Sequence, residues 1–513
     1  MICSFACCLR LSPLNPGAYY KYRIHHDCSR DPTNPEAREA TTESTKVEVD
    51  PLLVTWNGDD DPEHPYNWPL TRKWAITILL SNGGLVTLMS GAMLAPALKS
   101  IAVDLNTDEE ETQIFLSIFV LAFAFGPMIL SPLAEVFGRR PVWMLSSCFY
   151  ILWNTVAGFS QTPDLLIASR ILSGIGASAE FAISNPVLSD TWIPAQRGTS
   201  FAISTFIPLL GPALGPIIGG AVSQSIGWRW TFWILSIYDG LLVTIAFFVF
   251  SETYEVILLN RRASMLREST GRPYYTTTQA ASETLKSRLF VSLTRPFRLL
   301  VTQPILQVVA IFLAYNFGIL YLVLSTFATL WIERYGQSET QSGLNYIALV
   351  AGYTIAAQVG SRMMDRLWAY LKARAGNNTA PEYRVPLMIP GAILIPFGLL
   401  IYGWTAEKHF PWTVPDVGIA ILGCGIINNT QSMQAYVMDS YRQYVASASA
   451  ASQFLRSIAG FAFPIFAPAM YQKLGYGWGN SVLALTFIII GWPAPFLLWT
   501  YGAKLRAMGK PQR

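Results

Sequence analysis

Twelve long apolar segments follow one another along the 513-residue sequence, each bounded by charged residues, proline or glycine. Roughly 20 apolar residues cross one bilayer as a helix, which satisfies its own backbone hydrogen bonds there. Charged residues make up only 13% of the chain, where soluble domains carry about a quarter. The sequence therefore predicts an all-α polytopic membrane protein with twelve transmembrane helices. Their expected limits are 74–97, 113–133, 141–160, 165–188, 199–222 and 230–250, then 301–331, 343–361, 386–405, 414–438, 445–470 and 480–503.

Lysine and arginine are distributed unevenly among the loops between these segments. Basic loops alternate with acidic ones, such as the loop that carries residues 108–111. Because basic loops remain on the cytosolic side, we expect these loops and both termini in the cytosol. The sequon at Asn377–Thr379 then lies on the side where it is not glycosylated. The basic residues concerned are Arg139, Arg140, Arg197, Arg261, Arg262, Arg267, Arg272, Lys286, Arg288, Arg295, Arg298, Arg362, Arg366, Lys372, Arg374 and Arg384.

The segments divide the chain into five parts. We expect a cytosolic disordered tail over 1–55, a six-helix half over 56–250 and a cytosolic central loop over 251–300. A second six-helix half follows over 301–503, and a short cytosolic tail over 504–513. The two halves are below called the first half and the second half.

The N-terminal tail contains a cluster of metal-ligand residue types. Its cysteine and histidine spacing matches no standard zinc pattern, so we predict no metal site. Palmitoylation is one alternative for the cysteines, and a plain disordered tail is the favoured interpretation. The residues are Cys7, Cys8, His25, His26 and Cys28.

The loop after the second segment reads SPLAEVFGRRP and contains opposite charges around a glycine. Glu135 precedes Gly138, and Arg139 with Arg140 follows it. A glycine turn with opposite charges can hold helix ends together in one conformation and release them in another. Ordinary positive-inside arginines are the alternative. Residues 361–366 repeat the pattern in part, as expected of duplicated transporter halves.

The fifth segment contains GPALGPIIGG, with glycines spaced four apart. Gly211, Gly215 and Gly219 lie on one helix face, and Pro212 with Pro216 lies beside them. Small residues at this spacing let a neighbouring helix approach closely, and the prolines permit bending. Generic helix packing would explain the glycines alone, but the repeated Gly-Pro pair is more specific.

The fourth segment carries two charges, Arg170 and Glu180. A charge inside the membrane is costly, so each residue is a candidate functional site. The two side chains lie ten residues and roughly 80° apart on a helix, which excludes a direct pair and predicts indirect coupling. The alternative for Arg170 is a structural arginine bonded to neighbouring carbonyls.

Several motifs together resemble one known family. They are SPLAEVFGRRP, RILSGIG and GPALGPIIGG, with DPEHPYNWP, GWRWTFWIL, SETYEVILLNRRA and FLRSIAGFAFPIFAPAMYQKLG. With these motifs the chain resembles the major facilitator superfamily, specifically the twelve-span fungal drug:proton antiporters, over about Thr55–Arg506. Ser131 and Val136 depart from the loop signature. The resemblance in this loop therefore rests more on the charge pair Glu135 and Arg139 than on the rest of the motif. The resemblance implies the major facilitator fold and proton-coupled export of small amphiphilic compounds.

The resemblance also implies roles for particular residues. Arg170 would tune or relay protonation in the first half, and the glycine motif, including Gly220, would form a bendable contact that favours export. From the charges alone we further predict that Arg170 keeps Glu180, or another carboxylate, near the pH at which it switches and so couples transport to protons. A cytosolic latch would consist of Glu135, Gly138, Arg139, Arg140 and Asp190. Candidates for a central substrate cavity are polar or aromatic residues at mid-depth, although such residues more often serve packing. They are Glu180, Tyr315, Asn316, Asn428, Gln431, Gln434 and Arg456.

The sequence leaves other classes of function less well supported. The chain contains no GxSxG, HExxH or Walker A motif, which disfavours a membrane enzyme, and no large extra domain suits a receptor. A proton-coupled importer or a polyamine transporter of the same fold remains the main alternative. We expect a plasma-membrane monomer that uses the proton gradient and no cofactor. Its expected partners are protons, an amphiphilic small molecule and the lipid bilayer, and not nucleic acid.

Overall fold

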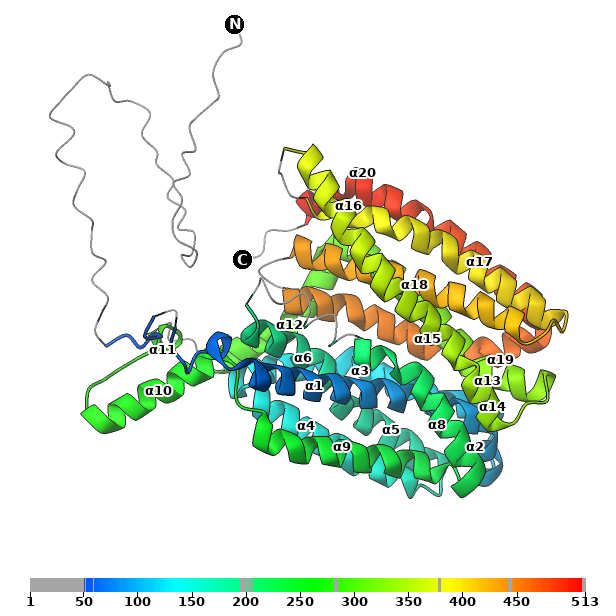
Figure 1. The fold of residues 1–513 in the computed structure, drawn as a ribbon, viewed down its shortest axis with the longest axis horizontal. Coiled ribbons are helices and arrows are strands. Elements are labelled where there is room, and N and C mark those ends of the chain that lie inside the picture. The colour runs from blue at the N-terminus through cyan, green and yellow to red at the C-terminus, as the bar shows by residue number, and fades with distance from the viewer. Residues whose placement is uncertain are drawn as a thin grey trace, which may run out of the picture.

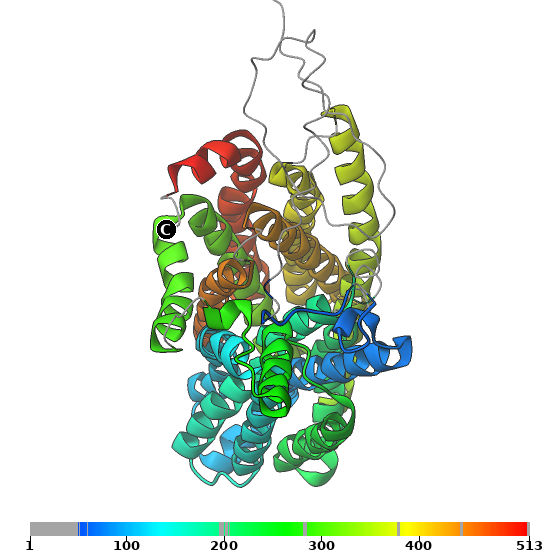
Figure 2. The ribbon, with the colours of Figure 1, turned by 90° about the vertical axis from the view of Figure 1, so that its left-hand side faces the viewer.

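Two helical bundles make up the computed structural model. The model describes residues 50, 52–58, 60–193, 200, 204, 206–280, 285–376, 380–441 and 445–509. Figure 1 shows the first half of the chain as the lower bundle and the second half as the upper one. In the perpendicular view of Figure 2 the same two groups remain separate. The predicted all-helical architecture in two halves is confirmed. The tail cysteines and histidines, Arg197 and the sequon lie outside the described residues.

Where the structure describes it, the first half follows the predicted segments, although helix breaks interrupt the first and fourth spans. The fourth predicted span is interrupted at Ser178, which ends one helix and precedes the next. Gly138, at φ 102°, separates the second and third spans. The elements are η2 (Pro65–Asn67), α1 (Leu70–Ala92), η3 (Ala95–Ala97), α2 (Leu98–Leu105), α3 (Glu109–Phe137), α4 (Arg139–Gly158), α5 (Pro163–Ala177), α6 (Ala179–Thr191), α8 (Gly211–Ile226) and α9 (Arg229–Val249).

The second half contains the remaining long helices. A π-helical turn interrupts its second span, and Gly475, at φ 71°, reverses the chain inside the element labelled α19. The elements are α13 (Pro304–Thr329), η4 (Leu330–Arg334), α14 (Glu339–Leu344), α15 (Tyr346–Ile355), η5 (Ala356–Gly360), α16 (Ser361–Arg374), η6 (Pro381–Leu387), α17 (Met388–Glu407), α18 (Thr413–Ser440), α19 (Val445–Gly491) and α20 (Pro493–Met508).

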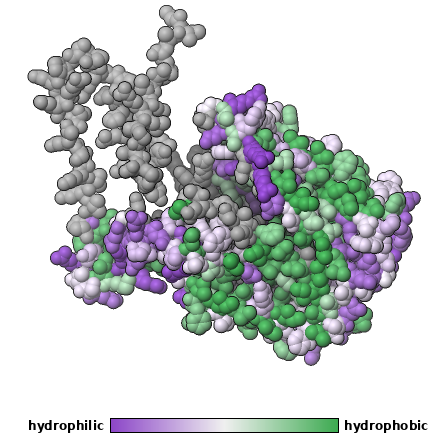
Figure 3. Space-filling model, viewed as in Figure 1, coloured by the Kyte–Doolittle hydropathy of each residue, from purple (hydrophilic) through white to green (hydrophobic). Residues whose placement is uncertain are grey.

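The outer surface of both bundles suits a lipid environment. In the described part of the chain, seven helical stretches are long and apolar enough to cross a membrane. One of them, Ala448–Met508, has 61 residues and contains the reversal at Gly475, so it holds two crossings. Large apolar side chains such as Phe248 and Ile489 are 80% and 73% exposed. Figure 3 shows broad apolar areas over the bundles, with polar residues concentrated toward the two ends.

The segment between the halves is largely helical. It contains α10 (Glu255–Thr270), α11 (Thr277–Ala280) and α12 (Leu285–Thr302), where the sequence predicted a loop. These helices lie at one end of the bundles, at the left in Figure 1. We call this end the linker end and the other the far end.

The last residues of the predicted tail pair with this linker. Val54 donates its backbone N–H to Tyr275 at 2.8 Å, so the expectation of disorder up to residue 55 is wrong here. Arg262 of α10 donates to Asp61 at 2.8 Å. This bond, with backbone N–H groups of Asn57 and Glu63, lowers the pKa of Asp61 to about 2. Asp61 is therefore ionised at neutral pH and ties the entry to α1 to the linker.

The two halves contact each other mainly through three helix pairs. Helix α3 packs on α19, and α8 packs on α14 and α15. Polar contacts join the halves at the far end: Lys99 pairs with Glu333 at 2.7 Å, and Ser100 donates to Glu339 at 2.8 Å. The bundles are thus held together at the far end.

Candidate functional site

Arg170 of α5 is fully buried among α1, α3 and α4. Its Nε donates to the carbonyl oxygen of Phe115 at 3.0 Å, and a terminal nitrogen donates to that of Ser90 at 3.1 Å. The guanidinium also lies 4.3 Å from the ring centre of Phe119. Within the described residues Arg170 forms no ion pair. Its geometry in this structure is therefore the carbonyl-bonded arrangement that the sequence left open as the structural alternative.

Glu180 lies in the first turn of α6 and is buried beside α1 and α4. Its carboxylate accepts hydrogen bonds from Trp143 Nε1 at 2.6 Å and from Ser184 Oγ at 2.9 Å. A Cβ placed on Gly83 would lie 1.9 Å from Glu180 Oε1, so glycine at that position leaves room for the carboxylate. In the described structure Glu180 has neutral partners and no pairing cation. A carboxylate in this setting can hold a proton without breaking an ion pair.

Asp239 of α9 is a second buried carboxylate, which sequence analysis missed. It is 4% exposed, and its charge lies within electrostatic range of Glu180 and Tyr150. Tyr150 in turn lies within electrostatic range of Arg170. The sequence contained a signal for this residue, because Asp239 is an acidic residue inside the predicted membrane span 230–250. The structure thus places Arg170, Tyr150, Asp239 and Glu180 in one electrostatically connected group within the first half.

The turn at Gly138 brings together part of the predicted cytosolic latch. Arg139 Nε lies 3.4 Å from Asp190 Oδ2, which joins the start of α4 to the end of α6. Arg140 instead donates to the carbonyl oxygen of Phe247 at 2.8 Å. Glu135, which we expected to pair with Arg139, makes no ion pair or hydrogen bond among the described residues. The expected Glu135–Arg139 pair is therefore absent from this conformation.

Glu252, which follows α9, is the carboxylate that binds the start of α4 at the Gly138 turn, where we expected Glu135. It accepts the backbone N–H groups of Arg139 at 2.9 Å and Arg140 at 3.2 Å, at the buried N-terminus of α4. A Cβ on Gly138 would lie 2.3 Å from its carboxylate. An anion at a helix N-terminus is favoured because it satisfies unpaired N–H groups. The sequence signal for Glu252 was the motif SETYEVILLNRRA, which contains it.

We expect Glu252→Gln to destabilise the turn. The amide group keeps one acceptor but loses the negative charge and the second acceptor at α4, a loss of about 1–3 kcal/mol. Thermal unfolding of the purified protein in detergent should show a lower midpoint than Glu268→Gln, which alters an exposed carboxylate on α10. Equal midpoints for the two variants would contradict this assignment.

The glycines of the fifth span lie against the end of α1. A Cβ on Gly211 would lie 2.7 Å from Leu88 Cβ, and one on Gly219 would lie 2.1 Å from the carbonyl oxygen of Met93. Gly215 has a similar close neighbour in Met89. Pro212 and Pro216 belong to the same helix, α8.

Gly220 of the same motif faces the second half. A Cβ there would lie 2.4 Å from the carbonyl oxygen of Glu339. The reciprocal contact comes from Gly343, whose Cβ would lie 2.6 Å from the carbonyl oxygen of Pro216. The motif thus contributes both to packing inside the first half and to the contact between halves.

The candidate cavity residues do not form one cluster. Tyr315 donates its hydroxyl hydrogen to the carbonyl oxygen of Leu483 at 3.2 Å, a contact inside the second half. Asn316 is buried, and both polar atoms of its side chain are without partners among the described residues. Asn428 and Gln431 both lie beside Gly360. Gln434 is half-buried on the same helix, α18.

One residue extends this set, and the last predicted member, Arg456, has an unpartnered nitrogen. Asn429, which sequence analysis missed, is fully buried on α18, and its amide group has no partner in the described structure. Arg456 of α19 lies 4.2 Å from the ring centre of Phe317. Its Nε is also buried without a partner among the described residues. Polar groups of α18 and α19 are therefore available for a ligand.

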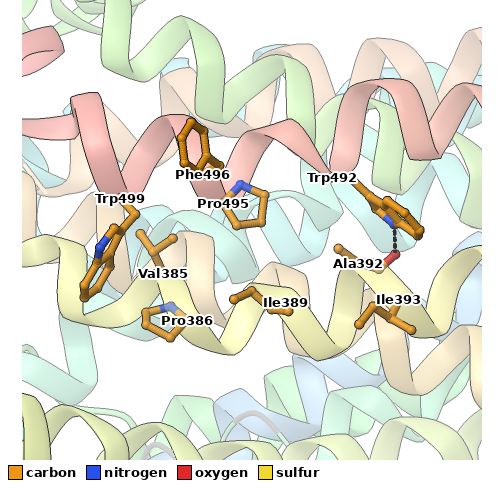
Figure 4. Close-up of a pocket in the computed structure, with 9 residues that line it drawn as sticks. All are labelled: Val385, Pro386, Ile389, Ala392, Ile393, Trp492, Pro495, Phe496 and Trp499. Carbon is orange, nitrogen blue, oxygen red and sulfur yellow. Dashed lines mark hydrogen bonds between the residues drawn. The ribbon is translucent and has the colours of Figure 1, made fainter.

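An apolar cavity lies elsewhere in the second half. It has a volume of about 510 Å³ between α17 and α20, with Trp492 and Trp499 at its two ends (Figure 4). Trp492 Nε1 donates to the carbonyl oxygen of Ala392 at 3.1 Å. Neither helix belongs to the contact between the halves, so this cavity is separate from the expected substrate path. In the described residues no group of three or more metal-ligating side chains gathers.

Two helical halves with charges buried inside them are a layout that known membrane-protein families share. The family model of the Major Facilitator Superfamily matches residues 80–464. The chain belongs to the Major Facilitator Superfamily. Members of this superfamily are transporters, and the protein is accordingly a multi-pass membrane transporter of small molecules and not an enzyme.

Fungal members of the superfamily are similar over most of the chain. The efflux pump vrtL of Penicillium aethiopicum is 39% identical over 479 residues, 93% of this chain and 95% of that protein. The probable efflux pump mfs2 of Aspergillus flavus is 42% identical over 420 residues, 81% of this chain and 98% of that protein. The efflux pump radE of Floropilus chiversii is 37% identical over 485 residues, 93% of this chain and 89% of that protein.

Solved structures of the superfamily share the fold. The proton:xylose symporter XylE bound to 6-bromo-6-deoxy-D-glucose superposes with a TM-score of 0.63 at 15% identity. That alignment covers 86% of this chain and all of the symporter. A partially occluded inward-open conformation of XylE from E. coli gives a TM-score of 0.59. At this identity the likeness shows the fold alone.

Proposed function

We propose that the protein is a proton-coupled antiporter that exports small amphiphilic compounds across the plasma membrane by alternating access. Efflux pumps at 37–42% identity support export of a fungal secondary metabolite, toxin or drug. The observation that carries proton coupling is the pair of buried carboxylates, Glu180 and Asp239, which lie in electrostatic range of each other without a pairing cation among the described residues. Carboxylates buried inside transporters commonly take up and release protons.

Antiport would use these groups in sequence. Protons entering from the acidic outer side would neutralise Glu180 or Asp239. The loss of that negative charge would favour rearrangement of the halves. Substrate bound from the cytosol would promote proton release inward. Arg170, held by carbonyl oxygens, would influence protonation of the carboxylates through its positive charge. Tyr150 lies within electrostatic range of both Arg170 and Asp239. Because an arginine stays protonated, it tunes the site and does not itself carry the proton.

The test uses inside-out plasma-membrane vesicles containing the protein. An acidic lumen should drive accumulation of rhodamine 6G or 2-naphthoate, and added substrate should raise the luminal pH. Vesicles without the protein, and vesicles whose gradient is collapsed by an ionophore, are the controls. A proton-coupled importer would instead expel the compound from the acidic lumen. Accumulation that ignores the gradient would contradict antiport.

Topology provides a separate prediction. A reporter inserted after Arg272 should report the cytosol, because eight basic residues lie in the stretch from Arg261 to Arg298. Arg272 lies in an exposed turn between α10 and α11, so an insertion there does not disturb a span. The same reporter placed in the acidic turn at Thr107 serves as the opposite control. A signal from outside the cell for the Arg272 insertion would reverse the proposed orientation.

A further inference from the structure

Arg456 is a half-buried cation without an anionic partner among the described residues. It lies on α19 and forms no hydrogen bond or ion pair among the described residues, and its Nε is sealed from the surface. Its guanidinium rests 4.2 Å from the ring centre of Phe317. As the twelfth residue of α19 it lies roughly 17 Å along the helix, near the middle of a bilayer core of about 30 Å. An unpaired charge at this depth is costly, which favours a site that receives an anion.

The face of α19 that carries Arg456 is directed toward the first half. Gly460 lies one turn further along and on the same face. A Cβ on Gly460 would lie 3.1 Å from the side chain of Val120 on α3 and 3.2 Å from that of Phe317. Arg456 therefore lies at the contact between the halves, where alternating access would admit a substrate.

Tyr321 connects this cation to the first half. Its phenol is within electrostatic range of both Arg456 and Arg170, and its ring lies 4.7 Å from that of Phe317. The hydroxyl oxygen would be 3.7 Å from a Cβ on Gly91 of α1. Among the described residues this hydroxyl makes no hydrogen bond. The Tyr321 phenol and the Arg456 guanidinium thus both lie against the ring of Phe317, and the phenol is also within electrostatic range of Arg170.

The surroundings of these groups are aromatic. Phe119 lies against Arg170 and Phe317 against Arg456, one ring from each half. A second contact between the halves, Phe125 with Phe454, has ring centres 5.5 Å apart. Such surroundings suit a flat apolar body attached to the acidic group.

We propose that Arg456 and Tyr321 bind the carboxylate of an aromatic amphiphile that the protein exports, in the positive field of Arg170. Arg456 donates to the carboxylate and the Tyr321 hydroxyl donates a further hydrogen bond. The rings of Phe119 and Phe317 contact the aromatic body. The proposal rests on the proposed export function, whose substrate class it names.

Binding without transport tests this site. The full-length protein in lipid nanodiscs is titrated at pH 7 with 2-naphthoate and with 2-naphthamide, its uncharged counterpart, and empty nanodiscs correct for partition into lipid. We expect naphthoate to bind at least about tenfold more tightly than naphthamide, the difference that one charge-assisted contact produces. Arg456→Gln should remove this preference, Arg456→Lys should retain part of it, and Tyr321→Phe should reduce it.

The control is Arg366→Gln, which removes an exposed positive charge from the same half and should leave both affinities unchanged. Retained naphthamide binding in Arg456→Gln shows that the variant is folded. The proposal is overturned if the unaltered protein does not bind naphthoate, or binds it no more tightly than naphthamide. It is also overturned if Arg456→Gln still prefers naphthoate. The binding assay imposes no proton gradient. Its result therefore does not depend on whether the antiport test succeeds or fails.

Discussion

Glu180→Gln is expected to abolish the dependence of export on a proton gradient while the protein still reaches the membrane. The substitution keeps the size of the side chain and an oxygen for Trp143 Nε1, which donates to Glu180 at 2.6 Å. Ser184 can reverse its hydrogen bond toward the new amide group. The variant therefore retains the packing beside Gly83 but cannot take up a proton. Gradient-driven accumulation in inside-out vesicles should fall by at least about tenfold, a barrier change of about 1.4 kcal/mol.

Asp239→Asn tests whether the two buried carboxylates act together. Because the charges of Asp239 and Glu180 interact, removing one should change the pH at which the other switches, and the double variant should lose no more than Glu180→Gln alone. Glu268→Gln, which changes an exposed carboxylate on α10, serves as the matched control and should transport normally. A Glu180→Gln protein that still responds fully to the gradient would place proton coupling elsewhere.

Gly219→Val is expected to block export through a steric effect. A Cβ at this position would lie 2.1 Å from the carbonyl oxygen of Met93, and a backbone atom cannot move aside as a flexible side chain can. Helix α8 must therefore separate from the end of α1, which disrupts the close packing that the small residue allows. Gly215→Val should act in the same direction but less strongly, because its nearest contact would be 3.0 Å from Met89.

The matched control is Gly240→Ala on α9, where an added Cβ meets no atom within 4 Å. Accumulation of substrate is normalised to the amount of protein in the vesicles, measured by immunoblot. We expect Gly219→Val to lower normalised accumulation by more than about tenfold and Gly240→Ala to preserve it. Normal transport by Gly219→Val would show that α8 and α1 do not need this close contact.

The sequence alone determined the class of protein and much of its architecture. Apolar segments of about 20 residues specify membrane helices because the bilayer cannot satisfy an unpaired backbone. The glycine spacing of four in Gly211, Gly215 and Gly219 specified one packing face, since that spacing repeats with the helix period. Arg170 and Glu180 were recognisable as candidate functional residues because charge inside a membrane is costly. The same rule could have identified Asp239.

Only the tertiary structure decided which of these groups meet. Glu135 lies closer in sequence to Arg139, yet Glu252 binds the start of α4, 113 residues away along the chain. Arg170 bonds to carbonyl oxygens of α1 and α3, and Arg456 lies against Phe317 within electrostatic range of Tyr321. Helical periodicity defines the face on which a side chain lies, but it does not define the helix that covers that face. The partner depends on how helices distant in sequence pack, and the energies of buried charges depend on that partner.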